Sequence, residues 1–115
     1  MKMVTSVVRP HQVENIKEAL QQLDVHGMSV FETQGFGRQG GHTETYRGTE
    51  YQIAFTPKST IQIVVTDDLV QKVIDTVVAT VRTGHIGDGK IWVTNVEQMI
   101  RIRTCLLYTS PSPRD

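Results

Sequence analysis

A chain of 115 residues is long enough for one compact domain and leaves little room for a second. Hydrophobic residues make up 38% of it and charged residues 21%, which argues against a disordered or membrane-spanning chain. Its 12 basic and 12 acidic residues give a formal net charge of +0, which argues against nucleic-acid binding through bulk charge. The one cysteine, Cys105, and an N-terminus without a signal-peptide pattern predict a cytoplasmic location.

The first part of the chain predicts a strand, a helix and a second strand. Residues 2–9 are rich in valine and too few for a stable helix, so they predict a strand that ends before Pro10. An amphipathic helix follows, and Gly27 stands where a helix stop signal is expected. The apolar stripe of this helix consists of Val13, Ile16, Leu20 and Leu23. Residues 28–36 contain several β-formers and predict the second strand.

A polar, glycine-punctuated stretch over residues 37–52 predicts a long loop, and long loops in compact domains are usually functional or disordered. Residues 59–66 predict a third strand by their alternation. Its core-facing side chains are Ile61, Ile63 and Val65. Asp67 and Asp68 are expected to cap a second helix. The apolar stripe of that helix consists of Val70, Val73, Ile74, Val77, Val78 and Val81.

The last part of the chain predicts a glycine-rich turn over residues 83–90 and a fourth strand over 91–94. Apolar and basic residues then alternate over 100–103, which predicts a further extended segment. Residues 105–115 lack periodicity and contain Ser-Pro-Ser-Pro. We expect them to be a disordered, non-native tail after a single domain of residues 1–104; a genuine flexible tail is the alternative.

The order strand, helix, strand, strand, helix, strand predicts an α+β fold. It matches the ferredoxin-like βαββαβ plan, in which an antiparallel sheet carries both helices on one face. The other face of the sheet would be semi-polar and uncovered. Such a face favours contact with further copies of the chain, so we expect a closed homo-oligomer.

Gly84, Gly89 and Lys90 satisfy the pattern G-x-x-x-x-G-K, in which glycines let backbone amides approach phosphate oxygens and lysine adds a charge. A P-loop-like ATP-hydrolysing enzyme is therefore the alternative function. Ile91 argues against it, because a P-loop has Ser or Thr at that position to hold magnesium. A plain glycine turn is the structural alternative.

Arg101 and Arg103 are two residues apart, so on an extended segment both side chains would point the same way. Together with Lys90 they predict a compact cationic pocket for phosphate; a solvated basic edge strand is the alternative. Gly35, Gly37, Arg38 and Gln39 form a second glycine-rich element that would approach the same polyphosphate from a neighbouring subunit.

No catalytic constellation is visible in the sequence, because the histidines lack metal-ligand spacing and no Ser/His/Asp arrangement can be argued. An RNA-binding ferredoxin-like module is a third class. Its strands would offer only Phe31 and Trp92 for base stacking, without an RNP-type pattern.

Three stretches carry a family resemblance: GFGRQGGHTETYRGTEY (35–51), RTGHIGDGKIWV (82–93) and IRIRT (100–104). They closely resemble the PII nitrogen-regulatory signal-transduction proteins, in order and register across residues 1–104. The resemblance implies homotrimers of ferredoxin-like subunits that are regulators and not enzymes. It implies that ATP and ADP compete for clefts between subunits and that 2-oxoglutarate binds with MgATP. Residues 37–55 correspond to the family's T-loop, which docks onto targets, and 82–90 to its B-loop.

The resemblance also implies residue roles. Gln39 would ligate Mg²⁺ and contact 2-oxoglutarate, Lys58 would pair with a 2-oxoglutarate carboxylate, and Tyr51 would be uridylylated or adenylylated, with an unmodified tyrosine as the alternative. The nucleotide-binding residues would be Ser29, Gly35, Gly37, Arg38, Gln39, Val64, Gly87, Asp88, Gly89, Lys90, Arg101 and Arg103. Target proteins implied by the family are an ammonium transporter, glutamine synthetase adenylyltransferase and a sensor kinase. A role in nitrogenase regulation is also implied.

The sequence departs from the family pattern at a few positions. Gly40 and His85 replace common lysines, and Gln62 replaces a common glutamate near the adenine site. Ala54 replaces a common acidic residue, which leaves partner specificity open, and Cys105 replaces the usual glycine.

Overall fold

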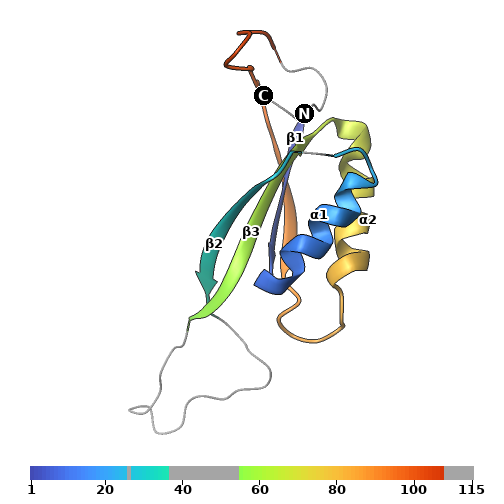
Figure 1. Ribbon diagram of the computed structural model, residues 1–115, viewed down its shortest axis with the longest axis vertical. Coiled ribbons are helices and arrows are strands. Elements are labelled where there is room, and N and C mark those ends of the chain that lie inside the picture. Colours follow the sequence, from blue (N-terminus) through green and yellow to red (C-terminus); the bar gives the residue numbers. More distant parts are fainter. Residues whose placement is uncertain (26, 37–54, 108–115) are drawn as a thin grey trace, which may run out of the picture.

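The computed structural model describes residues 1–25, 27–36 and 55–107. Within them the elements follow the predicted order strand, helix, strand, strand, helix, strand (Figure 1). They are β1 (Lys2–Val8), α1 (Val13–Gln21), β2 (Ser29–Gly35), β3 (Thr56–Val65), α2 (Val70–Val81) and β4 (Lys90–Asn95).

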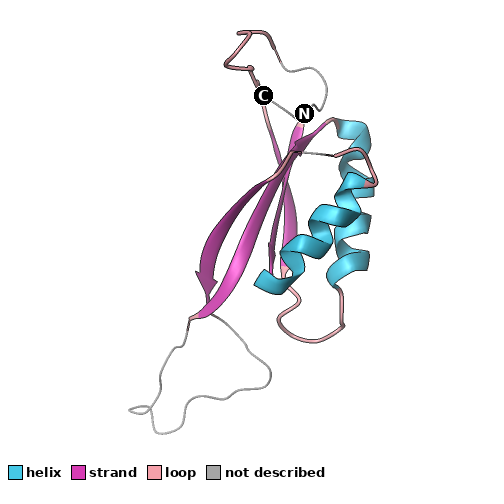
Figure 2. Ribbon diagram, in the orientation of Figure 1, coloured by secondary structure: helices cyan, strands magenta, loops and turns pink. Residues whose placement is uncertain are grey.

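The strands form one antiparallel sheet with the spatial order β2-β3-β1-β4. The register sets Val4 of β1 opposite Ile63 of β3 and Val93 of β4. Both helices lie on the same side of this sheet (Figure 2). The arrangement is the predicted ferredoxin-like α+β fold.

The core lies between the sheet and the two helices, because side chains alternate between the faces of each strand. Ile61, Ile63 and Val65 are all at most 1% exposed, as their alternation predicts. The helices contribute residues at three- and four-residue spacing. The buried apolar side chains are Val4, Val8, Ile16, Leu20, Val25, Ile61, Ile63, Val65, Val73, Val77 and Val81.

Within residues 1–25, 27–36 and 55–107, the opposite face of the sheet carries no helix, and it is called the open face here (Figure 2). Thr5 pairs with Gln62 and with Trp92, so these three side chains lie on that face in one row across β3, β1 and β4. Phe31 of β2 shares the face through its partner Thr60. Phe31 and Trp92 are 45% and 43% exposed, which gives this face large apolar side chains.

Two helix-terminus predictions are wrong. Helix α1 ends at Gln21, before Gly27, because Asp24 adopts φ 65° and the Val25 amide donates to the Leu20 carbonyl, which closes the helix end. A short 3₁₀ turn over Asp67–Leu69 precedes α2, and neither start has a side-chain cap. The Asp67 carboxylate instead accepts from the N-terminal amine at 3.2 Å.

The prediction of an extended segment over residues 100–103 is also wrong. Ile100 bridges to Leu107, and residues 102–104 form a turn between them. The Cys105 amide donates to the Arg101 carbonyl at 2.8 Å, and Cys105 has φ 60°, a region that favours glycine. The predicted domain boundary after residue 104 falls within this turn, while residues 108–115 lie outside the described part. The non-native origin of the tail stays a prediction.

Candidate functional site

The glycine-rich loop over residues 82–89 joins the end of α2 to the start of β4. It lies at the end of the sheet where β2 ends and β3 begins (Figure 1). At this end of the sheet Lys58 pairs with Thr33, and Lys90 pairs with Val7. The loop therefore lies at the same end of the sheet as both junctions with residues 37–54, which are outside the described residues.

Asp88 organises the loop from inside. Its carboxylate accepts hydrogen bonds from the Thr83 amide at 2.8 Å, the Thr83 hydroxyl at 2.5 Å and the Gly84 amide at 2.9 Å. It also forms an ion pair with Arg9 Nη1 at 2.9 Å. A carboxylate with this many donors is fully engaged within the chain, so Asp88 shapes the loop.

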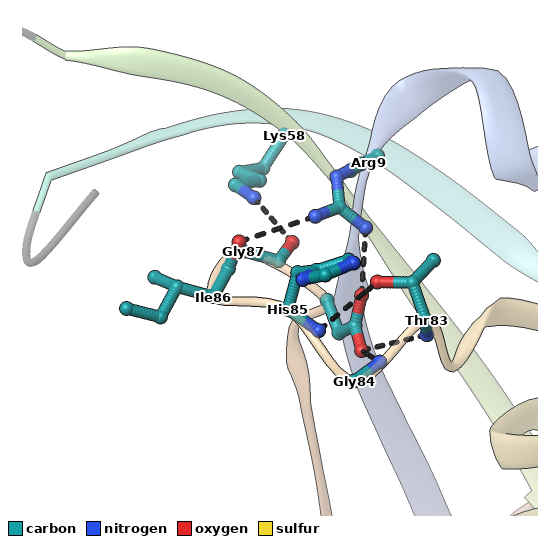
Figure 3. A network of polar contacts seen from close by, with 8 residues as sticks. Arg9, Lys58, Thr83, Gly84, His85, Ile86 and Gly87 are labelled. Atoms are coloured by element: carbon teal, nitrogen blue, oxygen red, sulfur yellow. Dashed lines mark hydrogen bonds and ion pairs between the residues drawn. The ribbon is translucent and has the colours of Figure 1, made fainter. Parts of the chain in front are cut away.

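Two cations hold the outer part of the loop by its carbonyl groups (Figure 3). Lys58 Nζ donates to the Gly87 carbonyl at 3.0 Å, and Arg9 Nη2 donates to the Ile86 carbonyl at 3.3 Å. Arg9 follows β1 and Lys58 lies in β3, so the loop is tied to two neighbouring strands. Burial and the nearby Arg9 charge lower the pKa of Lys58.

Two glycines are required by the path of this loop. Gly87 and Gly89 have φ angles of 105° and 114°, where side chains with a Cβ are strained. A Cβ at Gly89 would lie 2.0 Å from the Val7 carbonyl oxygen, and one at Gly87 would lie 3.0 Å from Arg9 Nη2. The backbone at both positions is therefore packed directly against β1 and the residue that follows it.

We expect the loop to keep its shape in acid. Hydrogen bonds from the Thr83 hydroxyl and from Arg9 hold the pKa of Asp88 far below its usual range. The stabilisation by an ionised Asp88 is present above the ordinary carboxyl pKa and is lost only as pH falls through the lowered native value. The amides of Thr83 and Gly84 should therefore remain protected from hydrogen exchange at about pH 3, below the ordinary Asp value.

The control for this prediction is Asp88→Asn, which removes the titrating group. In the parent protein, the exchange rates and NMR chemical shifts of the two amides should show a titration only far below pH 4. In the variant they should show no such titration. A loop transition near pH 4 in the parent protein would contradict the structure.

A cleft of about 370 Å³ adjoins the loop, between α2 and β4. Asp88, Gly89 and Lys90 form its loop side. Its remaining lining residues are Val8, Ile74, Val78, Val81, Arg82 and Ile91. The cleft is therefore mainly apolar, with cationic side chains among the residues that surround it.

The structure brings some of the predicted site residues together. Gly87, Asp88, Gly89 and Lys90 share the loop, and Lys58 contacts it. Ser29 pairs with Gln62, and Val64 lies two residues further along β3, so the side chains of Ser29 and Val64, both predicted to bind nucleotide, lie on the open face with Gln62. Gly35 is the last residue of β2. Gly37, Arg38, Gln39, Gly40, Tyr51 and Ala54 lie outside the described residues.

Arg101 and Arg103 do not join Lys90 within one chain. Lys90 is the first residue of β4, whereas Arg101 comes after the other end of that strand, where Asn95 pairs with Lys2. Residues 102–104 form a turn, so the two arginines do not alternate along a strand. One chain therefore does not form the predicted cationic pocket by itself, because β4 lies between Lys90 and the two arginines. A pocket built by two copies of the chain stays a prediction.

Sequence reasoning missed Arg9 and Thr83 as site residues. The glycine-rich pattern of residues 83–90 gives Thr83 no role, and the valine-rich pattern of residues 2–9 makes Arg9 the end of a strand. A carboxylate such as Asp88 inside a loop that resembles a phosphate-binding loop needs a positive charge beside it. No sequence motif connects residue 9 with residue 88. Only the pairing of β1 with β4 brings them together.

The order of elements around the loop also bears on enzyme chemistry. A P-loop follows a strand and opens a helix, whereas here helix α2 precedes the loop and strand β4 follows it. No group of three or more His, Cys, Asp or Glu side chains suited to a metal ion occurs in residues 1–25, 27–36 and 55–107. Over the same part of the chain, neither helix has the length and hydropathy to cross a bilayer.

Comparison with known proteins gives the family. Residues 1–105 match the family model "Nitrogen regulatory protein P-II". A relative from Klebsiella oxytoca with that name is 51% identical over 104 residues, which cover 90% of this chain and 93% of the relative. Relatives from Escherichia coli (strain K12), "Nitrogen regulatory protein P-II 1", and Bradyrhizobium diazoefficiens, "Nitrogen regulatory protein P-II", are 50% identical with the same coverage. With this coverage and the fold described above, the chain belongs to the nitrogen regulatory protein P-II family.

Proposed function

We propose that this chain is a nitrogen-regulatory signalling protein that binds ATP or ADP and, together with MgATP, binds 2-oxoglutarate. It acts on target proteins through residues 37–55 and is a regulator, not an enzyme. The observation that supports this most is the folded loop 82–89, in which Gly87 and Gly89 have positive φ and Arg9 and Lys58 hold the backbone.

Polyphosphate binding is favoured by the chemistry around the loop. Lys90 is exposed at the end of the loop and lines the adjoining cleft. Hydrogen bonds between a charged group and phosphate contribute roughly 1.5–3 kcal/mol each, so a few of them offset the cost of association. The Asp88 carboxylate does not oppose the ligand at full strength, because Arg9 lies beside it.

The proposed nucleotide site needs more than one copy of the chain. Lys90 and Arg101 lie at opposite ends of β4, so one ligand that contacts both must bridge two subunits. In a closed ring of three copies, packed through the open faces of their sheets, each loop 82–89 would lie beside another copy that can supply Arg101. We therefore propose a homotrimer with nucleotide in each cleft between subunits.

The effector switch follows from what Lys58 contacts. Without effector its ammonium group donates to a neutral carbonyl, that of Gly87. A 2-oxoglutarate carboxylate competes for the same ammonium group with a stronger, charge-assisted hydrogen bond. Mg²⁺ held by Gln39 would complete the effector site, so 2-oxoglutarate favours the MgATP state and shifts the population of residues 37–55.

Because the chain belongs to this family, the proposal also covers its target proteins and its covalent modification. Proteins that residues 37–55 would contact include an ammonium transporter, glutamine synthetase adenylyltransferase and a sensor kinase, all reached from the cytoplasm. Tyr51, which lies outside the described residues, remains the proposed site of nucleotidylylation.

The test is titration calorimetry with the mass of the assembly measured in the same buffer. We expect saturable binding of ATP and of ADP, competition between the two, and 2-oxoglutarate binding only when ATP and Mg²⁺ are present. A folded trimer that binds no ATP would refute the proposal. Sustained ATP turnover near 1 s⁻¹, roughly the low end for enzymes, would favour the enzyme alternative.

Lys58→Met should weaken 2-oxoglutarate binding more than ATP binding, because Lys58 would contact the effector directly and the phosphates only through the Gly87 carbonyl. Removing one charge-assisted contact of roughly 1.5–3 kcal/mol weakens 2-oxoglutarate binding about ten- to a hundredfold. The matched control is Lys72→Met, an exposed lysine of α2. Calorimetric titration of 2-oxoglutarate into the MgATP complex measures both. Equal affinity in the parent protein and Lys58→Met would exclude Lys58 from the effector site.

A further inference from the structure

The loop proposed to bind phosphate carries a negative charge of its own. Asp88 lies between Gly87 and Gly89, and its carboxylate is ionised because Thr83, Gly84 and Arg9 all favour the charged form. A carboxylate at this place repels an approaching polyphosphate. The loop therefore needs a cation that cancels the charge without occupying the space of the ligand.

Arg9 meets both conditions. One of its nitrogens pairs with Asp88 at 2.9 Å, and the other donates to the Ile86 carbonyl at 3.3 Å. The guanidinium lies directly against Gly87, since a Cβ at that glycine would come within 3.0 Å of it. The side chains of Arg9 and Asp88 are 27% and 21% exposed, so solvent screens this pair only in part.

We propose that Arg9 is a positioning residue that sets the preference of the site for ATP over ADP, by neutralising Asp88 where the terminal phosphates bind. The inference rests on the proposed nucleotide site and adds the determinant of its selectivity. It differs from the role of a phosphate ligand, because Arg9 acts on the nucleotide through Asp88 and the loop carbonyls.

The physical reason is the charge difference between the two nucleotides. ATP carries one more negative charge than ADP at its phosphate end, so an uncompensated Asp88 weakens ATP binding more. One unit charge about 7 Å from another changes binding roughly threefold to fiftyfold at effective dielectric constants of about 80 to 20. Loss of Arg9 should therefore lower the ratio of ATP to ADP affinity about threefold or more.

The experiment measures ATP and ADP affinities by calorimetry without magnesium, at low and high salt, for a charge series. Arg9→Gln should lower the ATP to ADP affinity ratio, and Asp88→Asn should raise it. The double variant Arg9→Gln/Asp88→Asn should return the ratio to the parent value, and Arg9→Lys should keep it there. The matched control is Glu14→Gln, which breaks the surface ion pair of Glu14 with Lys17. High salt should reduce each of these changes in the ratio of ATP to ADP affinity, because salt screens the charges.

A purely structural role predicts a different pattern. If Arg9 only holds the fold, Arg9→Gln weakens ATP and ADP equally and the double variant is worse than either single one; that result would overturn the inference. If Arg9→Gln does not fold, Asp88→Asn alone decides, since a ratio unchanged or lowered in that variant contradicts charge neutralisation. A parent protein that binds neither nucleotide refutes the proposed function itself and is seen before any variant is compared.

Discussion

Replacement of Gly89 by alanine is expected to destabilise the protein by about 3 kcal/mol and to abolish nucleotide binding. Two effects add at this position. The φ angle of 114° is strained for any residue with a Cβ, and that Cβ would lie 2.0 Å from the Val7 carbonyl oxygen. The obstructing atom is backbone of β1, which is paired on both sides in the sheet, so it has no room to withdraw. Urea unfolding measures the loss of stability, and calorimetry with ATP measures the loss of nucleotide binding.

Two other glycines provide matched controls. Gly84→Ala meets strain alone, because Gly84 has φ 87° but nothing lies within 4 Å of its Cβ position, so we expect a loss of about 1–2 kcal/mol. Gly35→Ala meets neither strain nor a neighbour, and its stability should change by less than about 0.5 kcal/mol. If Gly89→Ala unfolds at the same urea concentration as Gly35→Ala, the close contact with Val7 does not exist.

The sequence predicts the fold well because its strands and helices are periodic. The alternation of Ile61, Ile63 and Val65 fixes the buried face of β3. In α2 the predicted stripe is right at its buried residues Val73, Val77 and Val81 and wrong at Val78, which is 40% exposed. The buried face of a strand or helix is indicated by many residues together, because each of them is either apolar or polar. The last residue of a helix depends instead on one or two hydrogen bonds, which is why α1 closes at Asp24 and not at Gly27.

The candidate site could be predicted only in part. The glycines of the loop are visible in the sequence because their backbone conformation restricts the residue type. The partners of Asp88 are not, because Arg9 reaches it through the long-range pairing of β1 with β4. Arg101 and Arg103 were misplaced because a two-residue alternation fits both a strand and a tight turn, and the Cys105 to Arg101 hydrogen bond selects the turn.

The second large effect is expected at the open face of the sheet. Phe31→Glu should dissociate the proposed trimer, because a carboxylate placed in an apolar interface must be desolvated without a partner. Central aromatic residues of interfaces contribute about 2–4 kcal/mol each, so the dissociation constant should rise about a hundredfold or more. Sedimentation over a range of protein concentrations measures this as a fall toward the mass of one chain, 12.9 kDa.

Val30→Glu is the control that separates the two faces of the same strand. Val30 and Phe31 are adjacent in β2 and are both 45% exposed, but their side chains point to opposite sides of the sheet. A general penalty for charge on an edge strand would affect both variants alike, whereas an interface on the open face affects only Phe31→Glu. Because the proposed nucleotide site bridges two subunits, Phe31→Glu should also lose ATP binding while circular dichroism shows a folded chain. A monomer that still binds ATP would place the whole nucleotide site within one chain and rule out the contribution of Arg101 from a neighbour.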